Sequence, residues 1–600
     1  MYMTYVADQP SLLKESRPTF LKVQSDSKFR PTWLVRTSDM ERVPGTEATH
    51  GYCTLSYSWN YSGDIFPGKN GKYDFFDHGK HQIIFKKNIN KRKRENDEGE
   101  EQEKEEQAQE KEEQEKEKGG SSSFLDHHEV KEGKFEQLIK QVCKDFDIDY
   151  IWYDKICIDQ NDKAAKHAEI ARMHKIYQNA FYTVAMIPEM SIPEGFEDTV
   201  ITWKDTWGTL TGDDDVEKHS VMEKCLVDIG QSQWLQRLWT LEEAIMSKYI
   251  VFVGRNAHLW NTWRVFDAGT AGSLNIDSEI SKTLYGLHNN RNRRSANFIL
   301  RHAHVRSTTK EHDRAFALGN IFHNLMDVKV DYGLPLNTVL RNFYSDLIEK
   351  DLTVLCFGKA RDTYKSTIQG MHNLPSWTGI GGAHVIHVLT SKLKDKEMQD
   401  IIKIDRRIEV DTERDDDNDN DNDNNEIQKH RLHLNNISYI AAKPRHFPLV
   451  KEDLTIPFKN PYFPNGEDTE YELKRDLGTE ITHYITEFAS DPIQHEKMVR
   501  HMIDAVPTPG RNHPITFLSL TEECEECLIL DLPFSMGGKS LSSRIYPVVR
   551  KVEQNGQEDD VPLYKSIGIL YFRCRTFYLY SRPKFSKFTN DVQEGSFVIV

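Results

Sequence analysis

Between residues 50 and 255 the chain alternates short apolar runs with longer amphipathic stretches. The runs are rich in β-branched and aromatic residues and end at polar residues, glycine or proline, which is typical of buried strands. Four such runs are clear, and a weaker one lies at Gln82–Phe85. The clear runs are Tyr52–Trp59, Tyr150–Tyr153, Phe181–Ile187 and Tyr249–Gly254.

The stretches between these runs have apolar residues at helical spacing. Helices are expected over residues 130–146, from Asp162 to Ala180, and over Trp234–Lys248 with Ser232 as the N-cap. Helices that alternate with short strands require crossover connections, so the pattern predicts an α/β domain with a doubly wound parallel sheet. Sites in such sheets lie at the carboxyl ends of the strands.

The pattern changes on both sides of this domain. Residues 1–49 are expected to form a lead-in with a β-ribbon, 50–255 the α/β domain, 256–400 a mainly helical region, and 432–600 a β-rich region. Residues 86–123 and 411–426 are low-complexity sequence that cannot bury enough apolar surface to remain ordered, so both are expected to be disordered insertions.

The net charge of −16 comes from two low-complexity stretches. Residues 95–118 contain 13 acids and 4 bases, and residues 411–426 contain 9 acids and one base, a combined charge of −17. The rest of the chain is therefore nearly neutral, which gives no indication of a nucleic-acid partner. We expect no membrane span and no signal peptide, and hence a cytoplasmic protein, although the basic run Lys86–Arg94 leaves a nuclear address open.

The sequence predicts no metal centre and no disulfide framework. Eight cysteines are scattered over 600 residues, which suits a reducing compartment. Cys524 and Cys527 form a C-x-x-C pair without the second pair that zinc would need, and His127-His128-Glu129 is interpreted as the polar approach to a helix. Gly63–Asn70 resembles a phosphate-binding loop but lacks its hydroxyl residue, and an ordinary turn is favoured.

The first candidate site follows the strand Tyr150–Tyr153. Asp154 lies at its carboxyl end, and Cys157, Asp159 and Gln160 lie on the loop before the next helix. This is where a doubly wound sheet places functional groups. An alternative remains open, in which Asp159 or Asp162 caps the helix and Cys157 is part of the core.

The second candidate site is the helical segment Trp239–Glu243. Helical spacing places Glu243 one turn after Trp239 on the same face, with Glu242 turned about 100° away. A carboxylate beside an indole could stabilise a cationic, sugar-like transition state. The alternative is that Trp239 is a core residue and that Glu243 pairs with Arg237 or Lys248.

Several motifs together resemble those of the heterokaryon incompatibility (HET) domain, in the same order along the chain. They are Tyr52–Trp59, Tyr150–Gln160, Met173–Ala180 and Arg237–Glu243, and the segments Asp313–Gly319, Val330–Tyr332 and Leu374–Trp377 resemble sequences that often follow that domain. The resemblance covers roughly residues 50 to 255.

This resemblance implies a fungal-type effector of self/non-self recognition, a form of innate immunity, that triggers programmed cell death or growth arrest. HET domains are similar to TIR domains, which have a flavodoxin-like fold and some of which hydrolyse NAD⁺. By this similarity Glu243 is the candidate catalytic residue, and Ser56, Tyr57, Asp154, Asp159 and Trp239 are candidates for binding NAD⁺ as a substrate.

Two functional hypotheses follow from the resemblance. In the first, the HET domain is an NAD⁺ glycohydrolase that requires assembly to complete its pocket, with no cofactor of its own. In the second, the domain is a non-enzymatic module that self-associates and signals after a protein trigger is sensed. The two hypotheses share a fold and differ only in chemistry.

Overall fold

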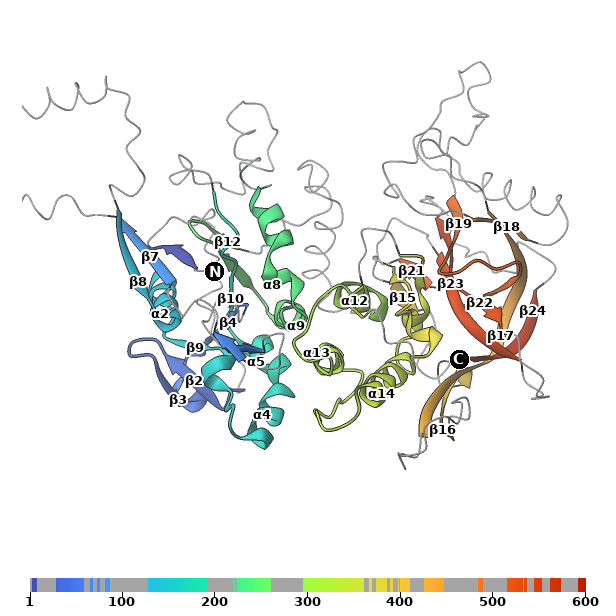
Figure 1. The fold of residues 1–600 in the computed structure, drawn as a ribbon, viewed down its shortest axis with the longest axis horizontal. Helices are drawn as coiled ribbons and strands as arrows, with labels where there is room; N and C mark the ends of the chain where they lie inside the picture. Colours follow the sequence, from blue (N-terminus) through green and yellow to red (C-terminus); the bar gives the residue numbers. More distant parts are fainter. Residues whose placement is uncertain are drawn as a thin grey trace, which may run out of the picture. The chain divides into compact units, whose positions relative to one another are not determined.

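The computed structural model divides the chain into two compact units (Figure 1). The first contains residues 1–235 and 246–284, and the second contains residues 236–245 and 285–600. The parts of the chain that the structure describes are 3–7, 29–58, 81–86, 128–192, 224–260, 295–360, 374–385, 400–410, 426–446, 515–532, 544–552, 562–573, 592–600 and short segments between them.

The first unit is built on a seven-stranded sheet in the order β12-β11-β10-β4-β9-β2-β3. The four central strands are parallel and correspond to the four predicted apolar runs: β4 (Cys53–Ser56), β9 (Tyr150–Trp152), β10 (Thr183–Met186) and β11 (Ile250–Val253). In sequence order their arrangement across the sheet is second, first, third, fourth. The predicted mixed α/β architecture is therefore confirmed.

Both edges of this sheet are antiparallel; the sequence pattern predicted a β-ribbon before residue 50 but not its pairing with this sheet. β2 (Trp33–Arg36) and β3 (Glu41–Pro44), from the expected lead-in, extend the sheet beyond β9. β12 (His258–Trp260) pairs with β11 at the opposite edge. These strands are short, so they leave little periodic signal in the sequence.

The predicted helix over residues 130–146 begins later than expected. Its apolar face forms α2 (Phe135–Asp145), which buries Leu138, Ile139 and Val142. The residues before it form β8 (His128–Gly133), in a separate sheet with β7 (His81–Lys86) and β1 (Thr4–Val6). β8 is charged and has an exposed Val130, so no alternation of apolar residues marks it as a strand.

The predicted helix from Asp162 to Ala180 is two helices. Asp162 caps α4 (Lys163–Ile170), and its carboxylate accepts hydrogen bonds from the backbone N–H groups of Ala164 and Ala165. The chain turns at Arg172 and continues as α5 (Met173–Asn179). The short helix α3 (Asp154–Cys157) precedes both.

The second unit begins with helices, as the sequence predicts. α12 (Ala296–Ala303), α13 (Asp313–Ile321) and α14 (Leu336–Ile348) follow one another, and α13 packs against α14 (Figure 1). The Leu374–Trp377 motif ends in a 3-10 helix, η10 (Ser376–Thr378), with Trp377 fully buried. Gly379 follows with a φ of 71°, a conformation that costs glycine little.

The C-terminal part of the second unit is a ten-stranded sheet. Its longest strand, β17 (Glu426–His446), pairs with β16 (Ile402–Val410), β18 (Tyr484–Phe488), β20 (Cys527–Leu530) and β24 (Gln593–Ile599). The sheet also contains β15 (Leu389–Ser391), β19 (Ile515–Leu520), β21 (Phe534–Met536), β22 (Arg544–Lys551) and β23 (Leu563–Arg573). The predicted strand-rich region is confirmed.

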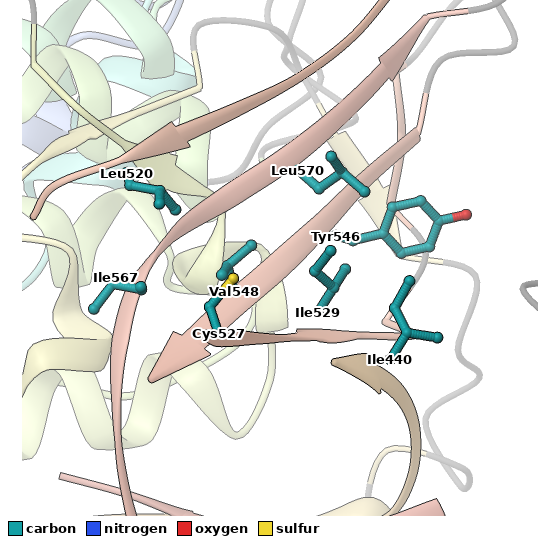
Figure 2. Close-up of a cluster of buried hydrophobic side chains, with 8 residues drawn as sticks. All are labelled: Ile440, Leu520, Cys527, Ile529, Tyr546, Val548, Ile567 and Leu570. Carbon is teal, nitrogen blue, oxygen red and sulfur yellow. The ribbon is translucent and has the colours of Figure 1, made fainter. Parts of the chain in front are cut away.

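A cluster of buried side chains forms one core of this sheet. Figure 2 shows aliphatic side chains from β17, β19, β20, β22 and β23 gathered around Val548 and Ile529, with Tyr546 among them. Alternate residues of neighbouring strands share a face, which explains why residues distant in sequence meet here.

Some predicted features lie outside the described residues. These are most of the two low-complexity stretches, the greater part of Gly63–Asn70, the basic run after Lys86, and the expected strand Phe577–Ser581. Within the described part of the chain, no helix is both long and apolar enough to cross a membrane.

Candidate functional site

Tyr57 and Asp154, two predicted site residues, meet at the carboxyl ends of neighbouring parallel strands. Tyr57 follows β4 and Asp154 follows β9, and the Tyr57 hydroxyl donates a 2.9 Å hydrogen bond to Asp154 Oδ1. The ring of Tyr57 packs against Phe135 and is 95% buried, whereas Asp154 is only partly buried. This end of the sheet therefore presents an anchored carboxylate with access to solvent.

Ser56 lies one residue deeper in the sheet and is buried. Its hydroxyl accepts a 2.6 Å hydrogen bond from the indole N–H of Trp234, in α8 (Gln233–Gln236). Beside it, the hydroxyls of Thr54 and Thr183 are 2.7 Å apart, and Thr183 also hydrogen-bonds to Ser247. Ser56 thus lies among buried neutral groups inside the sheet.

Asp159 and Cys157 have structural positions. The Asp159 carboxylate accepts hydrogen bonds from the backbone N–H groups of Asn161 and Asp162, which lowers its pKa and fixes the turn before α4. Cys157 is buried, and burial raises the pKa of its thiol to about 12. Both observations correspond to the structural alternative that the sequence left open.

The predicted helix Trp234–Lys248 is interrupted at Arg237 and Leu238. There the backbone forms an isolated parallel bridge with Ser307: Ser307 N–H donates to Gln236 O and Leu238 N–H donates to Ser307 O. Ser232 consequently caps only α8, through its hydroxyl and the Leu235 N–H. The chain resumes as α9 (Trp239–Met246), most of which belongs to the second unit.

Trp239 is held by a buried carboxylate from α13. Its indole N–H donates a 2.9 Å hydrogen bond to Asp313 Oδ2, and the Tyr332 hydroxyl donates a 2.6 Å bond to Asp313 Oδ1. Asp313 is 6% exposed, and burial raises its pKa despite these two donors. Trp239 itself is partly exposed, so it is not the core residue of the alternative interpretation.

Glu243 lies beside a buried arginine. Arg306 is 2% exposed and donates hydrogen bonds to the carbonyl of Arg237 and to the hydroxyl of Thr240, both at the start of α9. Burial lowers the pKa of Arg306 to about 9, and the negative charge of Glu243 opposes this shift. Arg306 therefore supplies the positive charge for which the sequence suggested Arg237 or Lys248.

Glu242 and Glu243 are both buried, with 0% and 7% of their surface exposed. The helical spacing that turns them onto different faces is present, but packing encloses both faces. An additional carboxylate in a buried environment is costly unless neighbouring groups compensate it. The nearly complete burial of Glu243 separates its side chain from bulk solvent.

The predicted site residues are divided between the units. Ser56, Tyr57, Asp154 and Asp159 belong to the first unit, and Trp239 and Glu243 to the second. Arg306, Asp313 and Tyr332 were not predicted as site residues. Asp313 and Tyr332 lie in segments whose resemblance to sequences after the HET domain gave a signal, whereas no pattern marked Arg306.

No group of three or more histidine, cysteine, aspartate or glutamate side chains that could hold a metal ion occurs among the described residues. The polar groups of the two candidate regions are instead hydroxyls, carboxylates and guanidinium groups. Such groups can bind and orient a polar organic ligand and stabilise developing charge.

The comparisons with known proteins give one match. Residues 52–243 match the family model described as Heterokaryon incompatibility protein (HET). No curated protein and no solved structure matches the chain. The matched range begins before β4 and ends at Glu243, so it includes all six predicted site residues. The chain therefore contains a region, residues 52–243, that matches the heterokaryon incompatibility (HET) domain.

Proposed function

We propose that this protein is an effector that triggers programmed cell death or growth arrest in response to non-self, through its HET domain. The observation that carries the proposal is the family match over residues 52–243. A protein trigger sensed by the rest of the chain and self-association of the domain complete the proposal, since an effector of this kind needs an input and a means of control.

The chemistry that we propose for the effector is hydrolysis of NAD⁺ to nicotinamide and ADP-ribose. The order of the four parallel strands supports it, because second-first-third-fourth is the beginning of the flavodoxin-like order and the TIR fold is flavodoxin-like. The polar carboxyl end of β4 and β9 supports it too, because ligands of such sheets bind at the carboxyl ends of strands. NAD⁺ is the substrate in this proposal, and no further cofactor is required.

Glu243 has the central role in this reaction. Its carboxylate stabilises the oxocarbenium-like ribose that forms as the bond to nicotinamide breaks, and it orients the attacking water. Ser56, Tyr57, Asp154, Asp159 and Trp239 contribute to binding. A buried carboxylate suits this chemistry, because charge stabilisation is stronger where water is excluded.

The experiment uses the neighbouring glutamates as a matched pair. The full chain, Glu243→Gln and Glu242→Gln are expressed inducibly in fungal cells, with cell viability and total NAD⁺ measured over time and the folded amount checked for each. NAD⁺ is expected to fall before viability in the full chain and Glu242→Gln, and to persist in Glu243→Gln. Equal NAD⁺ loss in the two variants would remove Glu243 from the reaction.

A second candidate function is a non-enzymatic module that signals by self-association. The contacts of the family's last motif favour it: Trp239 is bonded to Asp313, and Glu243 lies beside Arg306. In this interpretation both residues hold α9 in place and present a surface for assembly. Cell death without any loss of NAD⁺, combined with concentration-dependent oligomers in light scattering, would favour the module over the hydrolase.

A further inference from the structure

The C-x-x-C pair of the C-terminal sheet lies in the connection between β19 and β20. Cys527 opens β20, is 2% exposed and belongs to the buried cluster around Ile529 and Val548 (Figure 2). Cys524 is half-buried and packs against the same cluster. Cys527 is near enough to Cys524 to affect the pKa of its thiol as a hydrogen-bond donor. Sequence spacing alone left this pair without a role, and the fold places both residues at the same buried cluster.

The surroundings hold the connection in place. Glu522, two residues before Cys524, forms ion pairs with Arg550 of β22 at 2.7 Å and with Lys565 of β23 at 2.6 Å. Thr521 donates its backbone N–H to the carbonyl of Ile567. Cys527 is fixed at the other end by the ladder of β20. Both sulfur atoms are therefore positioned by the strands on either side.

The two thiols differ in acidity. The hydrogen bond from Cys527 lowers the pKa of Cys524, and the positive charge of Arg550 lowers it further, against the opposing effects of burial and of Glu522. The same hydrogen bond and burial raise the pKa of Cys527. Cys524, the more exposed and the more acidic of the two, is thus the thiol that reacts, and the buried Cys527 is its protonated neighbour. A low-pKa, accessible cysteine beside a second thiol is the arrangement found in redox-sensing sites.

The other described cysteines have the opposite character. They are buried, and burial raises the pKa of each thiol; they are Cys53, Cys143, Cys157, Cys225 and Cys356. Thiolate character and exposure control oxidation, so these thiols are protected. Among the described cysteines the reactive position is therefore Cys524.

We propose that Cys524 and Cys527 form a reversible thiol–disulfide site that reacts with hydroperoxides. The Cys524 thiolate attacks one peroxide oxygen and the O–O bond breaks, which gives a sulfenic acid and releases hydroxide. The Cys527 sulfur then attacks the Cys524 sulfur, the S–OH bond breaks, and the Cys527 proton leaves with the hydroxyl as water. In total, two thiols are oxidised to one disulfide and one hydrogen peroxide is reduced to two waters.

The experiment treats the reduced, full-length protein with hydrogen peroxide in small molar excess. Free thiols are alkylated under denaturing conditions at successive times, and peptides are measured by mass spectrometry. The peptide containing residues 524 and 527 is expected to lose two hydrogens before the peptide of any other described cysteine is oxidised. Treatment with dithiothreitol should restore both thiols.

Three variants separate the roles. Cys524→Ser should slow oxidation of the remaining thiol by about tenfold or more, because the low-pKa nucleophile is gone. Cys527→Ser should leave Cys524 as a sulfenic acid that dimedone traps, with no intramolecular disulfide. Cys225→Ser, a buried control, should behave like the unchanged protein. Oxidation of a buried cysteine first, or an unchanged rate in Cys524→Ser, would overturn the proposal.

Discussion

The centre of the sheet in the first unit and the helical part of the second unit bury polar groups in different ways. The sheet buries neutral groups: the hydroxyls of Thr54, Thr183 and Ser247 are joined by hydrogen bonds, and Ser56 accepts one from the Trp234 indole. The helical part buries ionisable groups, which include Glu243, Arg306, Asp313 and His304, and the buried ring of His384, from a short strand, packs against His304.

This difference has an energetic consequence. A neutral hydrogen bond contributes about 1 kcal/mol net, and its loss leaves a modest penalty. A buried ionisable group contributes only while its partners remain, because an uncompensated charge in the interior costs several kcal/mol. Single substitutions and changes in pH should therefore destabilise the sheet only slightly. The same changes should destabilise the helical part, which contains the contacts of α9, much more.

The largest expected effect is that of acid. His304 and His384 are fully buried, and burial lowers the pKa of His304 well below its usual range and that of His384 to about 3. The unfolded chain protonates near pH 6.5, so their contribution is fully present above that pH and is lost as the pH falls toward the folded pKa. The free energy of unfolding should fall by about 1.4 kcal/mol per pH unit for each histidine.

Hydrogen exchange measured by mass spectrometry, corrected for its intrinsic pH dependence, localises this acid effect. Protection of α12 and α14 should decrease between pH 6.5 and 5.0, and that of β10 should change less. His384→Gln keeps a donor for the Val354 carbonyl. In this variant, one proton fewer should be taken up on unfolding, so the free energy of unfolding should depend less steeply on pH. Equal losses of protection in both regions would contradict the comparison.

Arg306→Met should give the next largest effect. The change removes two hydrogen bonds to the start of α9 and the positive charge beside Glu243. Breaking such a buried pair costs about 3 kcal/mol or more. The loss in free energy of unfolding is measured by denaturant titration, with a probe that reports on the second unit. Arg406→Met is the matched control, because the exposed Arg406–Asp346 ion pair should contribute less than about 1 kcal/mol.

Asp313→Asn should lower the free energy of unfolding by about 2 kcal/mol. The amide cannot accept hydrogen bonds from both Trp239 and Tyr332 as strongly as the carboxylate does. A double-mutant cycle with Trp239→Phe, which removes only the indole donor, should reveal a coupling of about 1 kcal/mol. Asp313→Asn combined with Thr183→Val should be additive, because those side chains share no partner. Additivity between Asp313 and Trp239 would show that their hydrogen bond contributes nothing.

Thr183→Val should cost only about 1 kcal/mol, because it keeps the shape of the side chain and removes neutral hydrogen bonds. The cost should be the same at pH 5.5 and pH 7.5. A thermal unfolding series at the two pH values measures both quantities. A strong pH dependence would mean that ionisable groups contribute to this network.

The smallest effect on stability is expected for Tyr57→Phe. The partly exposed Asp154 keeps its hydrogen bond from the Lys155 N–H and can replace the phenol with water, so the cost should be below about 1 kcal/mol. Under the proposed function the same variant should reduce nicotinamide release by the purified protein. Unchanged release would exclude the Tyr57–Asp154 pair from the site.

The sequence by itself determined the central strands, the helical faces and the location of the HET domain. Four strands were identifiable because strands buried on both faces are rich in β-branched and aromatic residues and contain no charged side chain. Tyr57 and Asp154 could be expected to meet, since both follow parallel strands. Asp162 was identifiable as a cap because capping depends on residues two and three positions away.

Only the tertiary structure decided the surroundings of α9. Nothing near Arg237 breaks a helix, and the interruption comes from backbone pairing with Ser307, about 70 residues away along the chain. The carboxylate bonded to Trp239 and the cation beside Glu243 also come from the second unit. The spacing of apolar residues predicts which face of a helix is buried. The groups that cover this face come from distant parts of the chain, and the local sequence does not identify them.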